Sequence, residues 1–182
     1  MAKIELSNIS HTYNPNDLNP TYALNPFSMT WENGKRYAIL GPSGCGKTTM
    51  LNIVSGLIKP TKGSILFDNE DVTSQKTETR NISQVFQFPV IYNTMSVYDN
   101  LAFPLKCRGF EKNKIEERVQ SVSETLNLSS FLNMPARKLT ADQKQLISLG
   151  RGLVREDVAA VLMDEPLTVI DPDLKFRLRR NL

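Results

Sequence analysis

The sequence predicts an α/β fold whose core carries an inserted helical subdomain. Strand patterns occur toward both ends of the 182-residue chain, whereas the stretch between Ser96 and Arg155 has helical character. Strands and helices that flank a run of helices fit a layered α/β core with a helical insertion. A chain of this length has room for one domain with a substantial core, or for a core with a small insert.

The first expected strands follow from alternating apolar and polar residues. Ile4–Ile9 and Phe27–Trp31 alternate as half-buried strands do, and a turn at Glu32–Lys35 leads to the mostly apolar strand Arg36–Leu40. The other expected elements are strands Gly63–Phe67, Ile82–Phe86 and Val158–Met163, and helices Lys47–Leu57, Glu111–Leu126 and from about Asp173 to the end.

Composition and charge exclude several classes of protein. The net charge of +3, from 22 basic and 19 acidic residues, is too balanced to indicate a nucleic-acid partner. Two cysteines, Cys45 and Cys107, cannot form a disulfide framework and suit a reducing cytosol. Nothing resembles a signal peptide, and no apolar run approaches the roughly 18 residues that cross a bilayer. If the protein serves a membrane, we expect it to do so from one side.

A glycine-rich loop between an expected strand and an expected helix predicts a phosphate-binding site. It matches G-x-x-x-x-G-K-[S/T] at every fixed position, with Gly41, Pro42, Ser43, Gly44, Cys45, Gly46, Lys47 and Thr48. The glycines let successive N–H groups point inward, and the helix N-terminus adds partial positive charge. Lys47 would bind the β- and γ-phosphates, Thr48 would hold Mg²⁺, and Thr49 would contact the α-phosphate. Cys45 is expected to act as a small spacer. The alternative, a glycine-rich turn that binds nothing, is disfavoured by the strand–loop–helix context.

Two adjacent acids, Asp164 and Glu165, close the apolar segment Val158–Met163. An unpaired buried charge is costly, so packing alone does not explain acids at the end of a buried strand. Beside a phosphate loop, Asp164 is expected to be the outer-shell partner of Mg²⁺, and Glu165 to orient and polarise the attacking water. The alternative is an exposed strand terminus that Pro166 stops. Together the two motifs indicate a phosphate-loop NTPase that binds Mg·ATP.

The residues between these motifs resemble the ATP-binding-cassette (ABC) family along nearly the whole chain. Val85-Phe86-Gln87 resembles the family's Q-loop, whose glutamine contacts Mg²⁺ and the water and senses the transmembrane partner. Tyr13 resembles the aromatic residue that stacks on adenine, and Tyr22 competes for that role. Leu167-Thr-Val-Ile-Asp171 resembles the D-loop that crosses to the opposite subunit.

The segment Asn93–Leu105 is similar to the corresponding stretch of carbohydrate importers, and the group that the chain resembles most is the ATPases of bacterial glycerol and polyol importers. The resemblance implies a RecA-like parallel sheet with N-terminal antiparallel strands. On this basis we expect residues 1–90 and 156–182 to form the core, and about 91–155 to form the helical subdomain.

One departure from the family lies in its signature, Leu-Ser-Gly-Gly-Gln, where this chain has Leu139, Thr140, Ala141, Asp142 and Gln143. In the family this loop opens a helix and clamps the γ-phosphate that the other subunit holds. Thr140 can keep the hydroxyl, but Asp142 puts a carboxylate where glycine allows an anion to approach. Like charges about 4 Å apart repel by ~1 kcal/mol in water and by more in a drier interface. We expect the clamp to be impaired.

A second departure concerns the end of the chain. The family's switch histidine lies further beyond the catalytic glutamate than the 17 residues that follow Glu165 in the 182-residue sequence, and His11 is the sole histidine. The resemblance also implies a later parallel strand, between the phosphate-loop strand and the strand that ends at Asp164. We therefore expect the domain to be C-terminally incomplete in this chain.

The resemblance implies an ATP-hydrolysing subunit of an ABC transporter that imports a carbohydrate, glycerol or another polyol. Its expected partners are a second ABC ATPase subunit, two transmembrane permease subunits and, indirectly, a solute-binding protein. Asp142 favours a heterodimer over a homodimer. The expected location is peripheral, on the cytoplasmic face of the plasma (inner) membrane.

Three other functions remain open. A soluble ABC ATPase of translation or DNA maintenance would carry two cassettes or a long coiled coil, and neither is visible. A nucleotide-binding subunit with impaired hydrolysis fits Asp142 but not the intact Glu165. A small-molecule kinase leaves the signature and D-loop segments unexplained.

Overall fold

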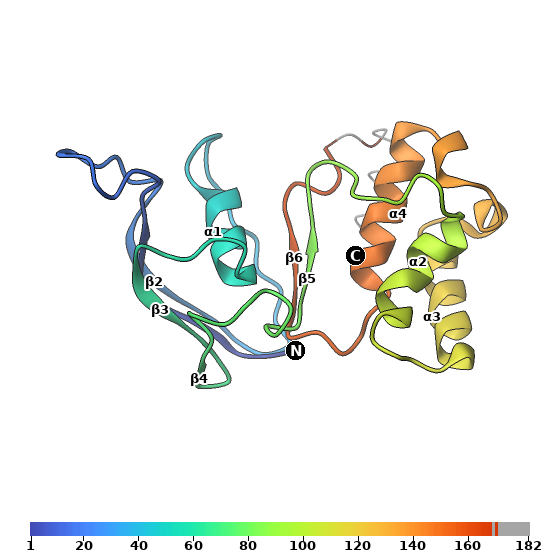
Figure 1. Ribbon diagram of the computed structural model, residues 1–182, viewed down its shortest axis with the longest axis horizontal. Coiled ribbons are helices and arrows are strands. Elements are labelled where there is room, and N and C mark those ends of the chain that lie inside the picture. The colour runs from blue at the N-terminus through green and yellow to red at the C-terminus, as the bar shows by residue number, and fades with distance from the viewer. Residues whose placement is uncertain (169, 171–182) are drawn as a thin grey trace. The chain divides into compact units, whose positions relative to one another are not determined.

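The computed structural model describes residues 1–168 and residue 170, and these form two compact units (Figure 1). The first unit comprises Met1–Ile82 and Asp157–Leu162, and the second comprises Ser83–Glu156 and the described residues after Leu162. Within the described residues no helix is both long enough and apolar enough to cross a membrane.

The first unit is built on an antiparallel sheet with the strand order β2-β1-β3-β4. The strands are β1 (Ile4–His11), β2 (Leu24–Trp31), β3 (Lys62–Phe67) and β4 (Glu70–Asp71). In the register of this sheet, Ile4 of β1 lies opposite Trp31 of β2 and Phe67 of β3. The expected N-terminal antiparallel strands are therefore confirmed, and β2 begins three residues before the alternating segment.

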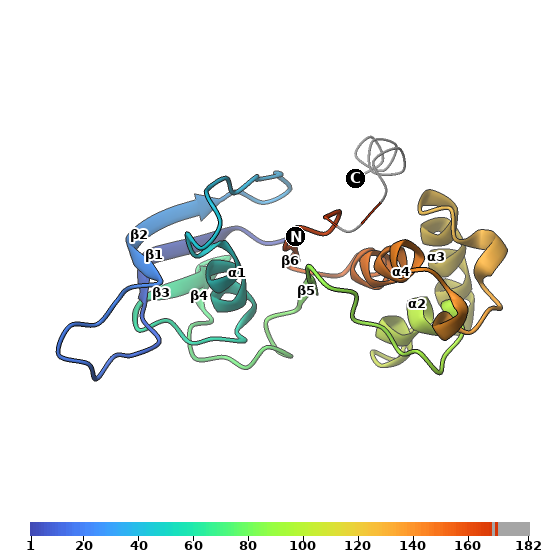
Figure 2. The same cartoon turned by 90° about the horizontal axis from the view of Figure 1, so that it is seen from above.

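Helix α1 (Lys47–Ser55) covers one face of this sheet (Figure 2). Its buried side chains pack with those of β1 and β3 in a cluster that includes Ile4, Leu6, Ile9, Met50, Leu51, Ile53, Val54, Ile65 and Phe67. The helix ends two residues before the expected Leu57 because Gly56 adopts a left-handed φ of 85° and donates its N–H to the Ile53 carbonyl.

The expected strand at Arg36–Leu40 is wrong. The turn before it forms, with Gly34 at a φ of 71°, but residues 35–40 have no regular structure. Leu40 is 91% exposed and Tyr37 is 49% exposed, so the apolar pattern does not correspond to burial here. A strand needs a neighbour to accept and donate its backbone hydrogen bonds, and no described strand pairs with this segment.

Strands β5 (Ile82–Val85) and β6 (Ala160–Met163) form a separate two-stranded sheet. Ala159 N–H donates to the Asn81 carbonyl, and Asp164 N–H donates to the Val85 carbonyl, both at 2.9 Å. Residue numbers increase in the same direction along both strands, so the pair is parallel. These strands correspond to the expected Ile82–Phe86 and Val158–Met163, each shorter by one or two residues.

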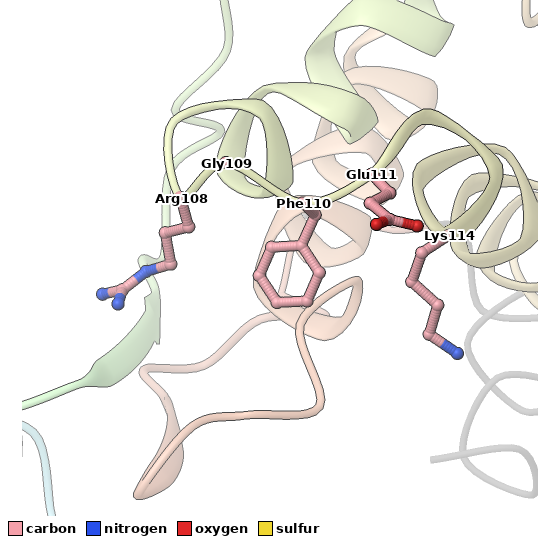
Figure 3. A pocket seen from close by; sticks show the side chains of 5 residues that line it. All are labelled: Arg108, Gly109, Phe110, Glu111 and Lys114. Carbon is pink, nitrogen blue, oxygen red and sulfur yellow. The ribbon is translucent and has the colours of Figure 1, made fainter.

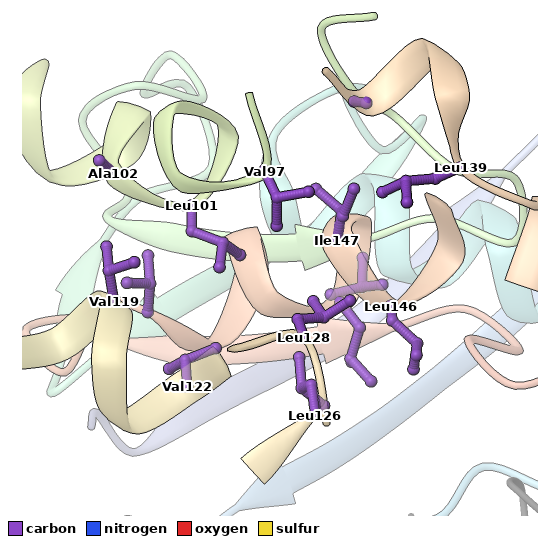
Figure 4. Close-up of a cluster of buried hydrophobic side chains, with 14 of the residues drawn as sticks. Val97, Leu101, Ala102, Val119, Val122, Leu126, Leu128, Leu139, Leu146 and Ile147 are labelled. Carbon is purple, nitrogen blue, oxygen red and sulfur yellow. The ribbon is translucent and has the colours of Figure 1, made fainter. Parts of the chain in front are cut away.

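The second unit contains the helices α2 (Val97–Lys106), α3 (Lys112–Thr125) and α4 (Ala141–Leu153), which pack around an apolar core (Figures 1 and 4). Its short 3₁₀ helices are η1 (Ser129–Phe131) and η2 (Ala136–Lys138). Gly150 of α4 has no room for a Cβ, because one would meet Leu101, Leu126 and Val122 at 2.6–3.3 Å. The expected helical character of this region is confirmed, and the helix expected from Asp173 lies outside the described residues.

Candidate functional site

The glycine-rich loop leads directly into α1, and that helix begins without a side-chain cap. Gly46 occupies the N-cap position with no side-chain hydrogen bond, and the first turn carries no acidic residue. The first N–H groups of a helix lack partners within the helix and carry partial positive charge. The start of α1 can therefore accept an anion from outside the chain.

Gly46 is required for the position of the loop. Its φ of 93° lies in the left-handed region, where a side chain is strained. A Cβ at this position would also lie 2.5 Å from the Ala23 carbonyl oxygen and 2.6 Å from Leu24 Cδ2. The loop rests directly on the chain at the start of β2 because residue 46 has no side chain.

The Lys47 ammonium lies across the loop. Lys47 Nζ donates to the carbonyl oxygens of Gly41 and Pro42, both at 2.9 Å, and lies 3.8 Å from Cys45 Sγ. These partners are neutral groups, so no carboxylate competes for the charge in these contacts. An anionic phosphate is a stronger acceptor than a carbonyl, because hydrogen bonds between ionised groups are about twice as strong.

Tyr13, expected to stack on adenine, lies near the start of α1. Its ring is 61% exposed, and its hydroxyl is 3.0 Å from Thr49 Oγ1. The His11 ring packs edge-on against it, with the ring centroids 4.7 Å apart. The contact with Thr49 links Tyr13 to the start of α1, whereas within residues 1–168 no comparable contact of Tyr22 is found. This geometry favours Tyr13 of the two.

Arg80, which the sequence analysis missed, holds the other end of α1. Its guanidinium is buried and donates to the carbonyls of Ile53 and Val54 at 2.8 and 3.0 Å, and to that of Thr73 at 2.9 Å. Burial lowers the pKa of Arg80, and the negative charge of Asp71 opposes that effect. A cation at a helix C-terminus interacts favourably with the helix dipole. In the sequence, Arg80 stands shortly before an apolar strand. That position alone does not show whether an arginine is buried or exposed.

The two acids that follow β6 differ in environment. Asp164 is buried, and its N–H donates to the Val85 carbonyl. Glu165 is exposed, has a φ of 45°, and accepts a hydrogen bond at 3.2 Å from the Thr168 hydroxyl. A left-handed backbone at a residue with a side chain costs free energy and is found mainly at functional sites. The turn directs Glu165 out of the strand while Asp164 remains in the core.

Gln87 lies two residues beyond the end of β5 and is half-buried. Because β5 and β6 are parallel neighbours, Gln87 and the pair Asp164–Glu165 follow the carboxyl ends of adjacent strands. Ligands of open α/β sheets bind beyond these ends. The structure thus brings the expected Q-loop and the two acids to the same edge of this strand pair.

The start of α4, where the family signature is expected, is closed by its own side chains. The Thr140 hydroxyl accepts from Gln143 N–H at 3.3 Å, and Gln143 Oε1 accepts from Thr140 N–H at 3.0 Å. This capping box satisfies two N–H groups of the helix start. Ala141 is the first helical residue and Asp142 the second, so the carboxylate lies in the first turn. Asp171 lies outside the described residues.

One pocket of the second unit does not involve the expected site residues. A pocket of about 430 Å³ near the junction of α2 and α3 is lined by Arg108, Gly109, Phe110, Glu111 and Lys114 (Figure 3). None of the expected site residues contributes to it. The candidate groups are therefore the phosphate loop with Tyr13 in the first unit, and Gln87, Asp164 and Glu165 in the second unit.

The comparison with known families decides the classification. The ABC transporter family matches residues 24–168, which include the phosphate loop, Gln87 and both acids. The chain belongs to the ABC transporter family. The predicted fold class and the resemblance stated from the sequence are thereby confirmed.

Relatives of this ABC chain are ATP-binding proteins of import and transport systems. It is 38% identical over its whole length to the sn-glycerol-3-phosphate import ATP-binding protein UgpC of Pectobacterium atrosepticum, covering 50% of that protein. It is 38% identical to the multiple sugar-binding transport ATP-binding protein MsmK of Streptococcus mutans, over 96% of this chain and 46% of the relative. The chain spans about half the length of the curated relatives it matches.

A solved ABC structure has the same fold. The dimeric, post-hydrolysis structure of the ATP-binding cassette MJ0796, bound to ADP and Pi, superposes with a TM-score of 0.85 at 25% sequence identity. The match covers 98% of this chain and 80% of that one.

The position of the Lys47 ammonium, bonded to two neutral carbonyls of the loop, predicts how nucleotide affinity responds to mutation. Replacement of Lys47 by Ala in the full-length protein should weaken ATP binding by one to two orders of magnitude, because the main side-chain charge for the β- and γ-phosphates is lost. Isothermal titration calorimetry measures this, with Lys35→Ala in the exposed turn as the control. Unchanged affinity in Lys47→Ala would show that the loop does not hold the phosphates.

Proposed function

We propose that this chain is the ATP-binding and ATP-hydrolysing subunit of an ABC importer of a carbohydrate, glycerol or a related polyol. The observation that carries the proposal is the uncapped start of α1 behind a complete phosphate-loop motif. The import direction is supported by the relative named for sn-glycerol-3-phosphate import, and the class of substrate by that relative and the one named for multiple sugar-binding transport.

Each residue of the loop has a distinct role in this proposal. Backbone N–H groups of Gly41, Ser43, Gly44, Cys45 and Gly46 surround the phosphates. Pro42 has no N–H and shapes the turn. Lys47 exchanges its two carbonyl partners for the β- and γ-phosphates. Thr49 contacts the α-phosphate, and Tyr13 moves from its hydroxyl contact with Thr49 to stack on adenine.

The donors that we assign to Mg²⁺ fit that ion. Thr48, Gln87 and Asp164 all supply oxygen, which Mg²⁺ prefers, and few protein ligands are needed when the phosphates complete the shell. Among the described residues no cluster of three His, Cys, Asp or Glu side chains forms a separate metal site. When bound, Mg²⁺ neutralises charge on the β- and γ-phosphate oxygens. We therefore propose that the ion is held together with the nucleotide.

Hydrolysis in this proposal depends on Glu165. Its carboxylate is exposed and is held only by the neutral Thr168 hydroxyl among the described residues. It can therefore turn to accept a proton of the attacking water and align that water with the γ-phosphate. Gln87 contributes a second contact to the same water.

The assembly that we propose follows the family. Residues 1–90 and 156–182 form the nucleotide-binding core, and about 91–155 form the helical subdomain. The chain pairs with a second ABC ATPase subunit and binds two permease subunits on the cytoplasmic face of the plasma (inner) membrane. A solute-binding protein acts indirectly, through the permeases. A soluble ABC ATPase of translation or DNA maintenance is disfavoured by the import proteins among its relatives.

The catalytic role of Glu165 is tested by Glu165→Gln in the full-length protein. The amide keeps the size of the side chain but removes the charge that polarises water. We expect turnover to fall by at least 100-fold while ATP stays bound, as measured by steady-state phosphate release and equilibrium ATP binding. The same change at the exposed Glu124 of α3 is the matched control. Hydrolysis at the parent rate in Glu165→Gln would refute the assignment.

We further propose that the partner ATPase is a different chain. Thr140 and Gln143 already use each other's hydrogen-bonding groups, and Asp142 adds a negative charge to the first turn of α4. Such a helix start repels the γ-phosphate of an ATP held by the partner. A homodimer would contain two such clamps, whereas a heterodimer contains one and keeps a normal signature for the ATP on this chain.

The heterodimer proposal predicts unequal sites. Asp142→Gly should raise hydrolysis at the partner's site severalfold and strengthen ATP-driven association, with this chain's own site nearly unchanged. Asp142→Asn, which removes only the charge, should give part of the gain. The measurement is site-resolved turnover in the assembled transporter, with each catalytic glutamate disabled in turn. Equal rates at both sites of the parent would contradict the proposal.

A further inference from the structure

Gln145 of α4 connects two loops that are far apart in the sequence. Its side chain is fully buried, at 0% exposure. Its amide nitrogen donates to the Phe86 carbonyl at 3.3 Å and to the Pro166 carbonyl at 2.9 Å. Phe86 precedes Gln87, and Pro166 follows Glu165. All of these residues belong to the second unit.

The chemistry of the three groups fixes the orientation of the amide. Backbone carbonyls only accept, so the NH₂ end of Gln145 must face both of them and uses both of its hydrogens. The Oε1 atom has no hydrogen-bond partner among the described residues. A buried acceptor without a partner costs free energy. The hydrogen bonds of this side chain to the described residues are therefore its two donations to the Phe86 and Pro166 carbonyls. An apolar residue could make neither of them.

Helix α4 also contacts residues 83–90, here called the Q-loop segment because they include the expected Q-loop, at other points. The Ser83 hydroxyl donates to the Gly152 carbonyl at 2.7 Å, and Val90 N–H donates to the Ser148 hydroxyl at 3.1 Å. These bonds hold residues 83–90 along the helix. They do not reach the turn after β6. Gln145 alone among these three α4 contacts joins the Q-loop segment to that turn.

Building on the proposed function, we propose that Gln145 is a positioning residue for ATP hydrolysis, which fixes the spacing between Gln87 and Glu165 by donating to the carbonyls beside them. Gln87 and Glu165 are both expected to contact the attacking water, so their separation determines whether the water is aligned. Small displacements of such groups reduce rate strongly without loss of substrate binding. Because Gln145 lies on the helix that Thr140 caps, the same side chain also ties the signature to this spacing.

The first test uses Gln145→Met in the full-length protein. Methionine keeps the length and volume of the side chain but cannot donate. We expect kcat to fall at least 10-fold while the KM and Kd for ATP stay within twofold, because the hydrogen bonds of the phosphate loop do not include Gln145. If kcat is unchanged while Glu165→Gln is inactive, this inference is overturned and the proposed function stands.

The second test does not depend on hydrolysis. Amide hydrogen exchange of the nucleotide-free protein should rise in Gln145→Met both at residues 86–90 and at residues 165–168. The matched control is Ser148→Ala, which removes the bond to Val90 and should raise exchange only near residue 90. If exchange at residues 165–168 does not rise in Gln145→Met, or rises equally in Ser148→Ala, the proposed link is wrong.

A third measurement needs no substitution, so a variant that fails to fold does not leave the inference untested. The side-chain amide protons of Gln145 in the parent protein should exchange at least 100-fold more slowly than those of the exposed Gln120. The reason is that both protons of the Gln145 amide are hydrogen-bonded and buried. Nitrogen-15 NMR of the amide-labelled protein measures this. Fast exchange of the Gln145 protons would overturn the inference.

Discussion

The start of α1 carries partial positive charge, with no side-chain cap and no acidic residue in its first turn, and contacts within the first unit hold it in place. Gly46 brings the loop against the chain at Ala23 and Leu24, which no residue with a side chain could do. Arg80 neutralises the opposite end of the helix by donating to the carbonyls of Ile53 and Val54. The apolar face of α1 is held against β1 and β3. A fixed helix with one open, positive end is a site for phosphate.

The start of α4 shows the opposite arrangement. Its N–H groups are met by Thr140 and Gln143, and Asp142 adds a negative charge within the first turn. The two helix starts thus differ in charge and in backbone: the N-cap of α1 is left-handed with no acid in the first turn, whereas that of α4 is extended and is followed by Asp142. This difference is the basis of the proposed pairing with an unlike ATPase subunit. The polar contacts of α4 are instead directed along its side, toward residues 83–90 and Pro166.

The sequence was informative where local geometry determines structure, and less so where distant residues decide. The phosphate loop, the antiparallel strands and the helices of the second unit follow from spacing and periodicity, which are local. The strand expected at Arg36–Leu40 fails because strand formation depends on a neighbour, and apolar residues alone do not supply one. Arg80 and Gln145 were missed for a related reason, since their partners lie up to 27 and 59 residues away in the chain. A glutamine on the buried face of α4 was the signal that could have identified Gln145.

The proposed function requires that the loop at α1 holds the β- and γ-phosphates of a nucleotide. Calorimetric titration of the unmodified full-length protein with ATP, ADP and AMP in the presence of Mg²⁺ tests this directly. ATP and ADP should bind at least 100-fold more tightly than AMP, because the contacts of Lys47 and of the helix start are made to the phosphates beyond the first. AMP binding as tight as that of ATP would contradict the account, since affinity would then come from the adenosine and not from the phosphate loop.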